Sequence, residues 1–255
     1  MHLARKHDAL IISDDVYDSL HWPVCRNEDA CRGDSSPATV LPRLCDIDIA
    51  LGPTDDDPRH FGNAVSNGSF SKIVAPGVRT GWAEGTPAFA YGLSQTGSTR
   101  SGGSPSQFGA TVMCRLLRHG TLDSHLQSVI IPALQRRHML LLSALDEHVA
   151  PLGVLYDTES GGRATYGGYF VWLSLPGTLD SEAIAEHAKK EENLIFGHGR
   201  MFEVYGDEES VPSRHHIRVS FSWESEEAIV EGIQRLASVL KLHLAKARRV
   251  SQRSG

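Results

Sequence analysis

The sequence predicts an α/β protein in which a β-rich first portion, a long helix and a smaller second α/β portion follow one another. Short apolar runs bounded by turn residues indicate strands in the first portion, and a long stretch with helical periodicity comes after them. A strand, a helix, a second strand and a closing amphipathic helix then follow in order. No internal repeat interrupts this order, so we expect two dissimilar layered portions joined by a helix.

The first portion alternates short strands with loops. The apolar run ALIIS (9–13) is typical of a strand buried on both faces, and MHLARKH before it reads as the end of an amphipathic helix. NAVSNGSF (63–70) and RTGWAEG (79–85) predict two further strands. The segments at about 23–60 and at 91–106 are rich in Pro, Asp, Gly, Ser and Thr, so we expect them to be mostly loop.

Helical periodicity dominates the middle of the chain. A helix at 106–118 would place Phe108, Val112 and Leu116 on one face, and a long helix at 122–149 should be kinked by Pro132. The remaining expected elements are strands at 167–175 and 217–222 and helices at 181–193 and 226–247.

Composition limits the class of protein. The chain has 255 residues, 40% hydrophobic and 22% charged, which is typical of a globular protein with a core. The net charge of −6 argues against nucleic acid as a partner, because phosphate binding requires a basic surface. No run approaches the roughly 20 apolar residues that cross a bilayer, so we expect no membrane association.

Cysteine and histidine spacing give no sign of a metal centre or a disulfide framework. Cys25, Cys31, Cys45 and Cys114 form no CxxC pair, and no HExxH motif is present. The N-terminus also lacks the pattern of a signal peptide. We therefore expect reduced thiols, no metal and a cytoplasmic location.

Several polar residues follow strand-like runs and could share one pocket. Asp14 and Tyr17 follow the first strand, whereas Lys72 and Arg79 follow the second. In an open α/β sheet the loops after the carboxyl ends of strands form the ligand crevice. This layout would gather a carboxylate, a phenol, an amine and a guanidinium.

These groups match the demands of pyridoxal 5′-phosphate chemistry. A lysine with a lowered pKa forms a Schiff base with an aldehyde, and Ser69, Ser71 and Arg79 suit a phosphate dianion. Asp14 could hold a proton on a pyridine nitrogen. Each signal alone also fits an ordinary turn with a solvated lysine or a capping aspartate. A P-loop is excluded because Ser71 occupies the position where that motif needs glycine.

Four motifs are spread over essentially the whole length of the chain: ARKHDALIISDDVYD, NGSFSKIVAPGVRTGWAEG, GGYFVWLSLP and HHIRVSFSW. In these motifs the chain resembles the class I/II aminotransferases, pyridoxal-phosphate enzymes of fold type I, and it is most similar to the aminoadipate- and kynurenine-aminotransferase-like branch. The resemblance implies a partial fold type I architecture. It would comprise part of the large cofactor-binding domain (1–120), an interdomain helix (121–150), a small domain (151–250) and a tail (251–255).

The resemblance also assigns roles to residues. Lys72 matches the Schiff-base lysine, Asp14 the partner of the pyridine nitrogen, and Tyr17 the phenol near the ring hydroxyl, with Asp15 the weaker alternative to Asp14. Ser69, Ser71 and Arg79 match the phosphate ligands. Arg218 matches the arginine that binds the substrate α-carboxylate.

The implied reaction moves an amino group between an amino acid and a 2-oxo acid. Lys72 would carry the cofactor and then transfer a proton at the substrate Cα, in two half-reactions that predict ping-pong kinetics. Members of this family act as homodimers, so a homodimer is implied for the complete protein. The motifs do not specify which amino acid or oxo acid is used.

The beginning of the chain departs from the family pattern. Family members carry an upstream segment with a glycine-rich turn for the phosphate, an aromatic residue that stacks on the ring, and an asparagine. These are not found before the first helix, so we expect an N-terminally truncated chain that binds the cofactor weakly and turns over poorly. Two alternatives stay open: a non-catalytic remnant that pairs with a paralogue, and a β-lyase or a cyclopropane-carboxylate-synthase-like enzyme.

Overall fold

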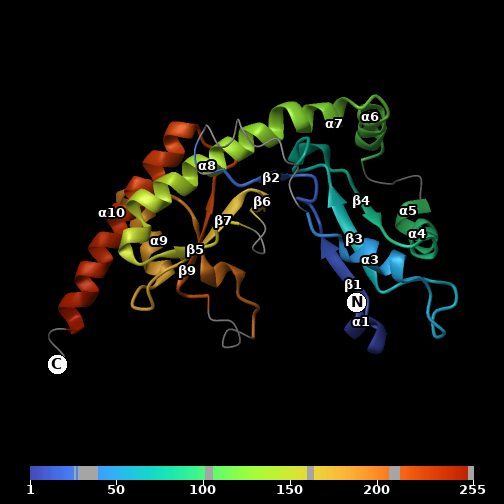
Figure 1. The fold of residues 1–255 in the computed structure, drawn as a ribbon, viewed down its shortest axis with the longest axis horizontal. Helices are drawn as coiled ribbons and strands as arrows, with labels where there is room; N and C mark the ends of the chain where they lie inside the picture. The colour runs from blue at the N-terminus through green and yellow to red at the C-terminus, as the bar shows by residue number, and fades with distance from the viewer. Residues whose placement is uncertain (26, 28–39, 101–105, 160–163, 207–212, 252–255) are drawn as a thin grey trace. The chain divides into compact units, whose positions relative to one another are not determined.

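The computed structural model describes residues 1–25, 27, 40–100, 106–159, 164–206 and 213–251. The chain divides into two compact units (Figure 1), which are described separately. The first comprises Met1–His21 and Thr39–Ile131, and the second comprises Trp22–Ala38 and Pro132–Gly255.

The first unit is built on a three-stranded sheet with the order β1-β3-β4. Strand β1 (Ile11–Asp14) runs parallel to β3 (Ala64–Ser69), and β4 (Gly81–Glu84) is antiparallel to β3. In this register Ile11 lies opposite Ala64, and Asp14 lies opposite Asn67. The polar residues that end β1 and β3 therefore lie at the same edge of the sheet, as the sequence predicted.

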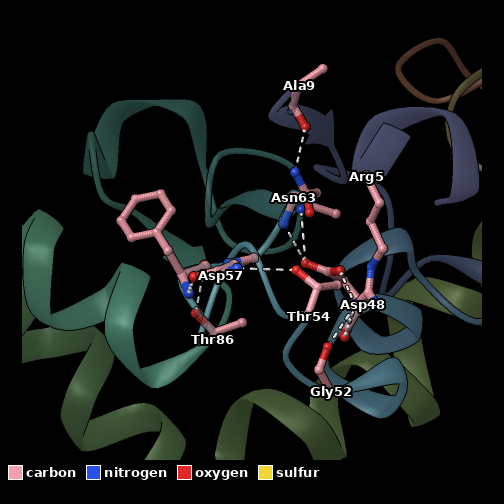
Figure 2. A network of polar contacts seen from close by, with 11 residues as sticks. Arg5, Ala9, Asp48, Gly52, Thr54, Asp57, Asn63 and Thr86 are labelled. Carbon is pink, nitrogen blue, oxygen red and sulfur yellow. Dashed lines mark hydrogen bonds and ion pairs between the residues drawn. The ribbon is translucent and has the colours of Figure 1, made fainter. Parts of the chain in front are cut away.

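The opposite, amino end of these two strands is held by a network of polar contacts around Asp48 (Figure 2). Asp48 belongs to helix α3 (Leu44–Leu51) and is fully buried. Its carboxylate accepts hydrogen bonds from the backbone N–H of Asn63 at 2.6 Å and of Ala64 at 3.1 Å, and from Arg5 of helix α1 (His2–Lys6) at 2.9 Å. Burial alone would raise the pKa of Asp48, but these donors outweigh it and leave the pKa below its usual value.

Further hydrogen bonds stabilise the amino end of β1 and β3. The Asn63 side chain donates to the carbonyl of Ala9 just before β1, and Arg5 also donates to the carbonyl of Gly52. Asp57 accepts the N–H groups of Phe61 and Gly62 in the turn that leads into β3. The start of each parallel strand is thus tied to α1 and α3 by side chains distant in sequence.

Helices occupy a segment for which the sequence predicted a loop. Helix α4 (Pro87–Ser94) and the short α5 (Gly97–Arg100) cover most of the described part of 91–106, so the loop prediction is wrong there; residues 101–105 lie outside the described residues. The local cause is capping. Thr86 accepts a hydrogen bond from the Phe89 N–H, and Pro87 occupies the first helical position, where its missing N–H costs nothing.

The helices at 106–149 are present, with an irregularity beside the proline. They are α6 (Gln107–Arg118), α7 (Thr121–His125), a π-helical turn (Leu126–Ile130) and α8 (Ile131–His148). Pro132 has no N–H to donate to the carbonyl of Ser128, and the chain leaves α-helical geometry directly before it. On α6 the buried side chain is Met113, whereas Phe108 is 84% exposed.

The second unit contains a four-stranded antiparallel sheet with the order β5-β7-β9-β8. Its strands are β5 (Leu155–Tyr156), β7 (Phe170–Ser174), β8 (Gly197–His198) and β9 (His216–Ser220). The two helices that follow the pattern predicted from sequence are α9 (Ser181–Glu191) and α10 (Glu226–Ser251). A separate pair of short strands joins β2 (His21–Pro23) to β6 (Thr165–Gly167), and 3-10 turns lie at Ala150–Leu152 and Gly199–Phe202.

Alternation along β7 and β9 separates two faces of this sheet. Val171, Leu173, Ile217 and Val219 are buried, and Val219 lines the same apolar space as Leu141 of α8 and Leu236 of α10. The intervening side chains, Trp172 and Arg218 among them, lie on the opposite face. One face therefore forms the core of the unit, and the other is available for contacts.

Burial changes one expectation, which concerns β1. Strand β1 forms as predicted, but the prediction that both of its faces are buried is wrong, because Ile12 is 69% exposed and only the face of Ile11 and Ser13 is partly covered in the described unit.

Cys25, Cys45 and Cys114 are free thiols, whereas Cys31 lies outside the described residues. Among the described helices, none has both the length and the apolar character needed to cross a bilayer.

Candidate active site

The candidate site in the first unit begins with two side chains at the carboxyl ends of β1 and β3. Asp14 is exposed, and the amide of Asn67 on the neighbouring strand donates to its Oδ1 at 3.2 Å. The Asp15 carboxylate has a different partner: its Oδ1 accepts the Ser13 hydroxyl at 2.6 Å, and its Oδ2 is buried without a partner among the described residues. Asp14 is therefore the carboxylate that the sheet presents at its open edge.

Lys72 and Tyr17 lie near each other in the turns that follow these strands. Tyr17 is in the turn after β1, where its carbonyl accepts the Leu20 N–H at 2.8 Å. Lys72 is in the turn after β3, and its Nζ lies 5.6 Å from the centre of the Tyr17 ring. Both side chains are half-buried. A cation at this distance from a phenol ring is attracted by the ring's electron density, so the pairing helps to orient the amine.

Ser69, Ser71 and Arg79 belong to one hairpin, the connection between β3 and β4. The Ser71 N–H donates to the Ser69 hydroxyl at 3.1 Å, and the Phe70 N–H donates to the carbonyl of Thr80 at 3.1 Å across the hairpin. Arg79 adopts a left-handed backbone with φ 46° after the 3-10 turn Pro76–Val78, and its guanidinium donates to the carbonyl of Pro76. The guanidinium is exposed at the surface of this hairpin.

Gly68 and Trp82 form the support beneath this hairpin. They are opposite partners in the β3–β4 register, and a Cβ atom on Gly68 would lie 2.1 Å from Cε2 of the Trp82 indole. The Trp82 ring also packs on Phe70, with ring centres 4.8 Å apart. Glycine is thus required at this position of β3, because the indole occupies the space of a side chain.

Arg43 links the turn after β1 to β4. Its guanidinium forms ion pairs with Asp46 at 2.8 Å, with Glu84 at 2.5 Å and with Asp18 at 3.7 Å. The hydrogen bond from Arg43 is the main cause that lowers the pKa of Glu84. Sequence reasoning missed Asn67, Gly68 and Arg43, because their importance depends on cross-strand partners that no local motif indicates.

Arg218 lies in the second unit, on β9, and is half-buried. Its guanidinium carbon is 4.0 Å from the centre of the Phe170 ring and 4.3 Å from that of the Phe202 ring. The remaining site residues predicted from sequence, Asp14, Tyr17, Ser69, Ser71, Lys72 and Arg79, all lie in the first unit. Within the described chain, no group of three or more His, Cys, Asp and Glu side chains is arranged to hold a metal ion.

No protein-family model matches the chain. An uncharacterized protein of Saccharomyces cerevisiae, YER152C, is 37% identical over 245 residues, which are 94% of this chain and 50% of that protein. Aromatic-amino-acid aminotransferase 1 of Thermococcus litoralis is 30% identical over 246 residues, 96% of this chain and 49% of that enzyme.

A similar solved structure is the α-aminoadipate aminotransferase LysN of Thermus thermophilus in complex with N-(5′-phosphopyridoxyl)-L-leucine. It has a TM-score of 0.71 and 26% identity, over 96% of this chain and 53% of that chain. The chain thus spans about half the length of the relatives that it matches. The fold class predicted from the sequence motifs is confirmed. The homologues and structural neighbours of this chain include aromatic-amino-acid, aminoadipate and kynurenine aminotransferases, and its fold is part of fold type I, the fold of pyridoxal-phosphate-dependent aminotransferases.

Proposed function

We propose that this chain carries the lysine-bearing part of an aminotransferase site, which moves an amino group between an amino acid and a 2-oxo acid with pyridoxal 5′-phosphate. The observation that carries the proposal is the gathering of Asp14, Lys72 and Tyr17 beside the Ser69–Arg79 hairpin at one edge of a parallel strand pair. Aminotransferase relatives over nearly the whole chain support the reaction class.

The residues at this edge suit the cofactor. Asp14 is an exposed carboxylate with a single described donor, Asn67, so it retains acceptor capacity for a protonated ring nitrogen. The hydroxyls of Ser69 and Ser71 and the exposed Arg79 guanidinium are the donors that a phosphate dianion requires. Lys72 would hold the aldehyde.

When bound, the cofactor supplies an electron sink for the substrate Cα. The chain's own groups would do the rest. Asp14 would keep the ring nitrogen protonated, and Tyr17 borders the amine. The freed amine of Lys72 would take the proton from the substrate Cα and deliver it to the former aldehyde carbon of the cofactor, on the other side of the transferred nitrogen. Arg218 would bind the substrate carboxylate through its planar fork of N–H donors.

The length of the chain bears on the rate. The chain spans about half the length of its relatives. The rest of the fold that those relatives contain is therefore not supplied by these 255 residues. We expect this chain alone to retain the cofactor weakly and to turn over slowly. A homodimer and a cytoplasmic location stay part of the proposal.

Trapping the cofactor on the lysine tests this function. The purified chain is mixed with pyridoxal phosphate, reduced with borohydride and mapped by peptide mass, and we expect the label on Lys72. Lys72→Ala should abolish the label, whereas Lys190→Ala, an exposed lysine paired with Glu191, should retain it. A label spread equally over surface lysines contradicts the proposal.

Product analysis then separates the reaction types. With an amino acid and 2-oxoglutarate, an aminotransferase forms glutamate, and its initial rates give parallel double-reciprocal lines. A lyase instead releases ammonia or a side-chain fragment. Labelling at Lys72 without any product would favour a non-catalytic protein that retains the cofactor site.

A further inference from the structure

The connection between β3 and β4 is contacted by the start of helix α6. Ser106, the residue directly before α6, donates from its hydroxyl to the carbonyl oxygen of Val78 at 2.7 Å, and the hydroxyl of Thr80 lies 3.0 Å from each of these two oxygen atoms. All three residues belong to the first unit. Side chains from two separate segments therefore converge on a single backbone carbonyl, that of Val78.

Ser106 occupies the N-cap position of α6 but does not cap the helix. A serine at this position ordinarily accepts a hydrogen bond from a backbone N–H of the first helical turn. The Ser106 side chain makes no such bond, and its backbone is left-handed with φ 61°, which is uncommon for residues other than glycine. The hydroxyl thus binds the hairpin instead of its own helix.

Gly109 provides the space for this contact. A Cβ atom on Gly109 would lie 2.7 Å from both the Ser106 hydroxyl and the Val78 carbonyl oxygen, and 2.8 Å from the Thr80 hydroxyl. These separations are shorter than an ordinary van der Waals contact, so a larger residue in the first turn of α6 would push the helix away from the hairpin. Glycine at this position lets the two segments approach closely enough for the hydrogen bond.

The carbonyl held in this way belongs to the peptide group that precedes Arg79. Arg79 has a left-handed backbone with φ 46° and ψ 40°, a conformation that is strained for a residue with a Cβ atom. Rotation of the peptide group toward a common conformation would carry the Val78 carbonyl away from Ser106 and Thr80. The two hydroxyls therefore hold the peptide group in the orientation that sets the direction of the Arg79 side chain.

We propose that Ser106 is a positioning residue for the cofactor phosphate, which acts by holding the Val78 carbonyl and thereby keeping Arg79 in its left-handed conformation. The proposal rests on the proposed function and adds to it a residue that affects the phosphate only through Arg79. Without this support the peptide group before Arg79 would have to be ordered when the phosphate binds, and that ordering would lower the affinity for the phosphate.

Binding of pyridoxine 5′-phosphate and of pyridoxine to the whole chain tests the proposal. Both carry an alcohol where the cofactor has its aldehyde, so neither reacts with Lys72, and they differ only in the phosphate. Affinities are measured by following the amide resonances of the chain by NMR. Ser106→Ala should weaken pyridoxine 5′-phosphate by about twofold to tenfold, the range expected for loss of one hydrogen bond, and should change pyridoxine by less than about twofold. A merely structural role would weaken both ligands alike.

Further variants show whether the effect passes through Arg79. Arg79→Ala should weaken pyridoxine 5′-phosphate by itself, and adding Ser106→Ala to it should cause no further loss, because residues in one network are not additive. Ser106→Gly removes the same hydroxyl and suits a positive φ, so it should reproduce Ser106→Ala and decides the matter if that variant fails to fold. Thr111→Ala is the matched control: it removes a hydroxyl that donates to the Gln107 carbonyl within α6, and it should change both affinities by less than about twofold.

Four results would overturn the proposal: no binding of pyridoxine 5′-phosphate by the unsubstituted chain, unchanged affinity in both Ser106 variants, equal weakening of pyridoxine, or an undiminished loss when Ser106→Ala is added to Arg79→Ala. These measurements use neither the Lys72 amine nor an aldehyde. Failure of the borohydride label at Lys72 would therefore reject the proposed function without affecting them, and absence of the Ser106 effect would leave the label unchanged.

Discussion

The two ends of the β1–β3 strand pair are built from similar residues and are used differently. At the amino end, the buried carboxylate of Asp48 accepts hydrogen bonds from Arg5, Asn63 and Ala64 (Figure 2). At the carboxyl end, the exposed carboxylate of Asp14 has one described donor, the Asn67 amide. A carboxylate whose acceptors are filled by its own chain contributes to stability, whereas one left open at a sheet edge is available for a ligand.

Removing the filled carboxylate should have the largest effect on stability. Asp48→Ala would leave Arg5 and two backbone N–H groups without an acceptor, and we expect unfolding to become easier by about 3–5 kcal/mol. Urea denaturation followed by tryptophan fluorescence measures this loss. Asp56→Ala, at an exposed position in the same unit, serves as the matched control and should stay within about 0.5 kcal/mol of the unsubstituted chain.

The same carboxylate predicts a pH dependence. The pKa of Asp48 is lower in the folded chain than its ordinary value of 3.8, so its contribution to stability is fully present above about pH 4 and is lost as the pH falls through the lowered folded pKa. Urea midpoints of the unsubstituted chain should therefore fall more steeply below pH 4 than those of Asp48→Ala. Parallel curves for the two proteins would contradict the role assigned to Asp48.

A glycine near the carboxyl end of β3, opposite Trp82 of β4, should have the next largest effect. Gly68→Ala forces a Cβ atom into the Trp82 indole, and we expect a loss of about 1–3 kcal/mol from overpacking. The Trp82 fluorescence should shift with it, because the ring must move. Gly97→Ala, where a Cβ atom meets nothing within 4 Å, should be neutral or slightly stabilising. Equal stability of the two variants would show that the indole relaxes without cost.

The carboxyl end of the strand pair was more predictable from sequence than the amino end. Asp14 and Lys72 directly follow apolar strand patterns, and parallel strands place such residues at one edge by their geometry alone. Asp48 was not predicted, because its partners Arg5 and Asn63 are distant in sequence and no motif connects them. The helix at Pro87–Ser94 was missed for a different reason: its Thr86 cap lies upstream of the Gly- and Ser-rich segment that suggested a loop.

The site residues also differ in how far local pattern could identify them. The serines and Arg79 are close in sequence to Lys72, so one motif contains the whole hairpin. Phe202 lies in a segment with no periodic signal, and its contact with Arg218 follows only from the pairing of Gly197 with Arg218 in the β8–β9 register. Residues that act through a neighbour across a sheet are visible only after the register is known.

Asn67 gives the smallest expected change in stability and the sharpest comparison of the two ends. Its side chain is exposed, so Asn67→Ala should alter the free energy of unfolding by less than about 0.5 kcal/mol. If the Asn67 amide orients Asp14 for the cofactor ring, the variant should nevertheless retain less pyridoxal phosphate in equilibrium dialysis, by about twofold to tenfold for one lost hydrogen bond.

Asn63→Ala, at the amino end, should show the opposite pattern: measurable destabilisation through loss of its hydrogen bond to the Ala9 carbonyl, with cofactor retention unchanged. If both asparagine variants changed stability alike and cofactor retention alike, the division between a supporting end and a binding end would have to be abandoned.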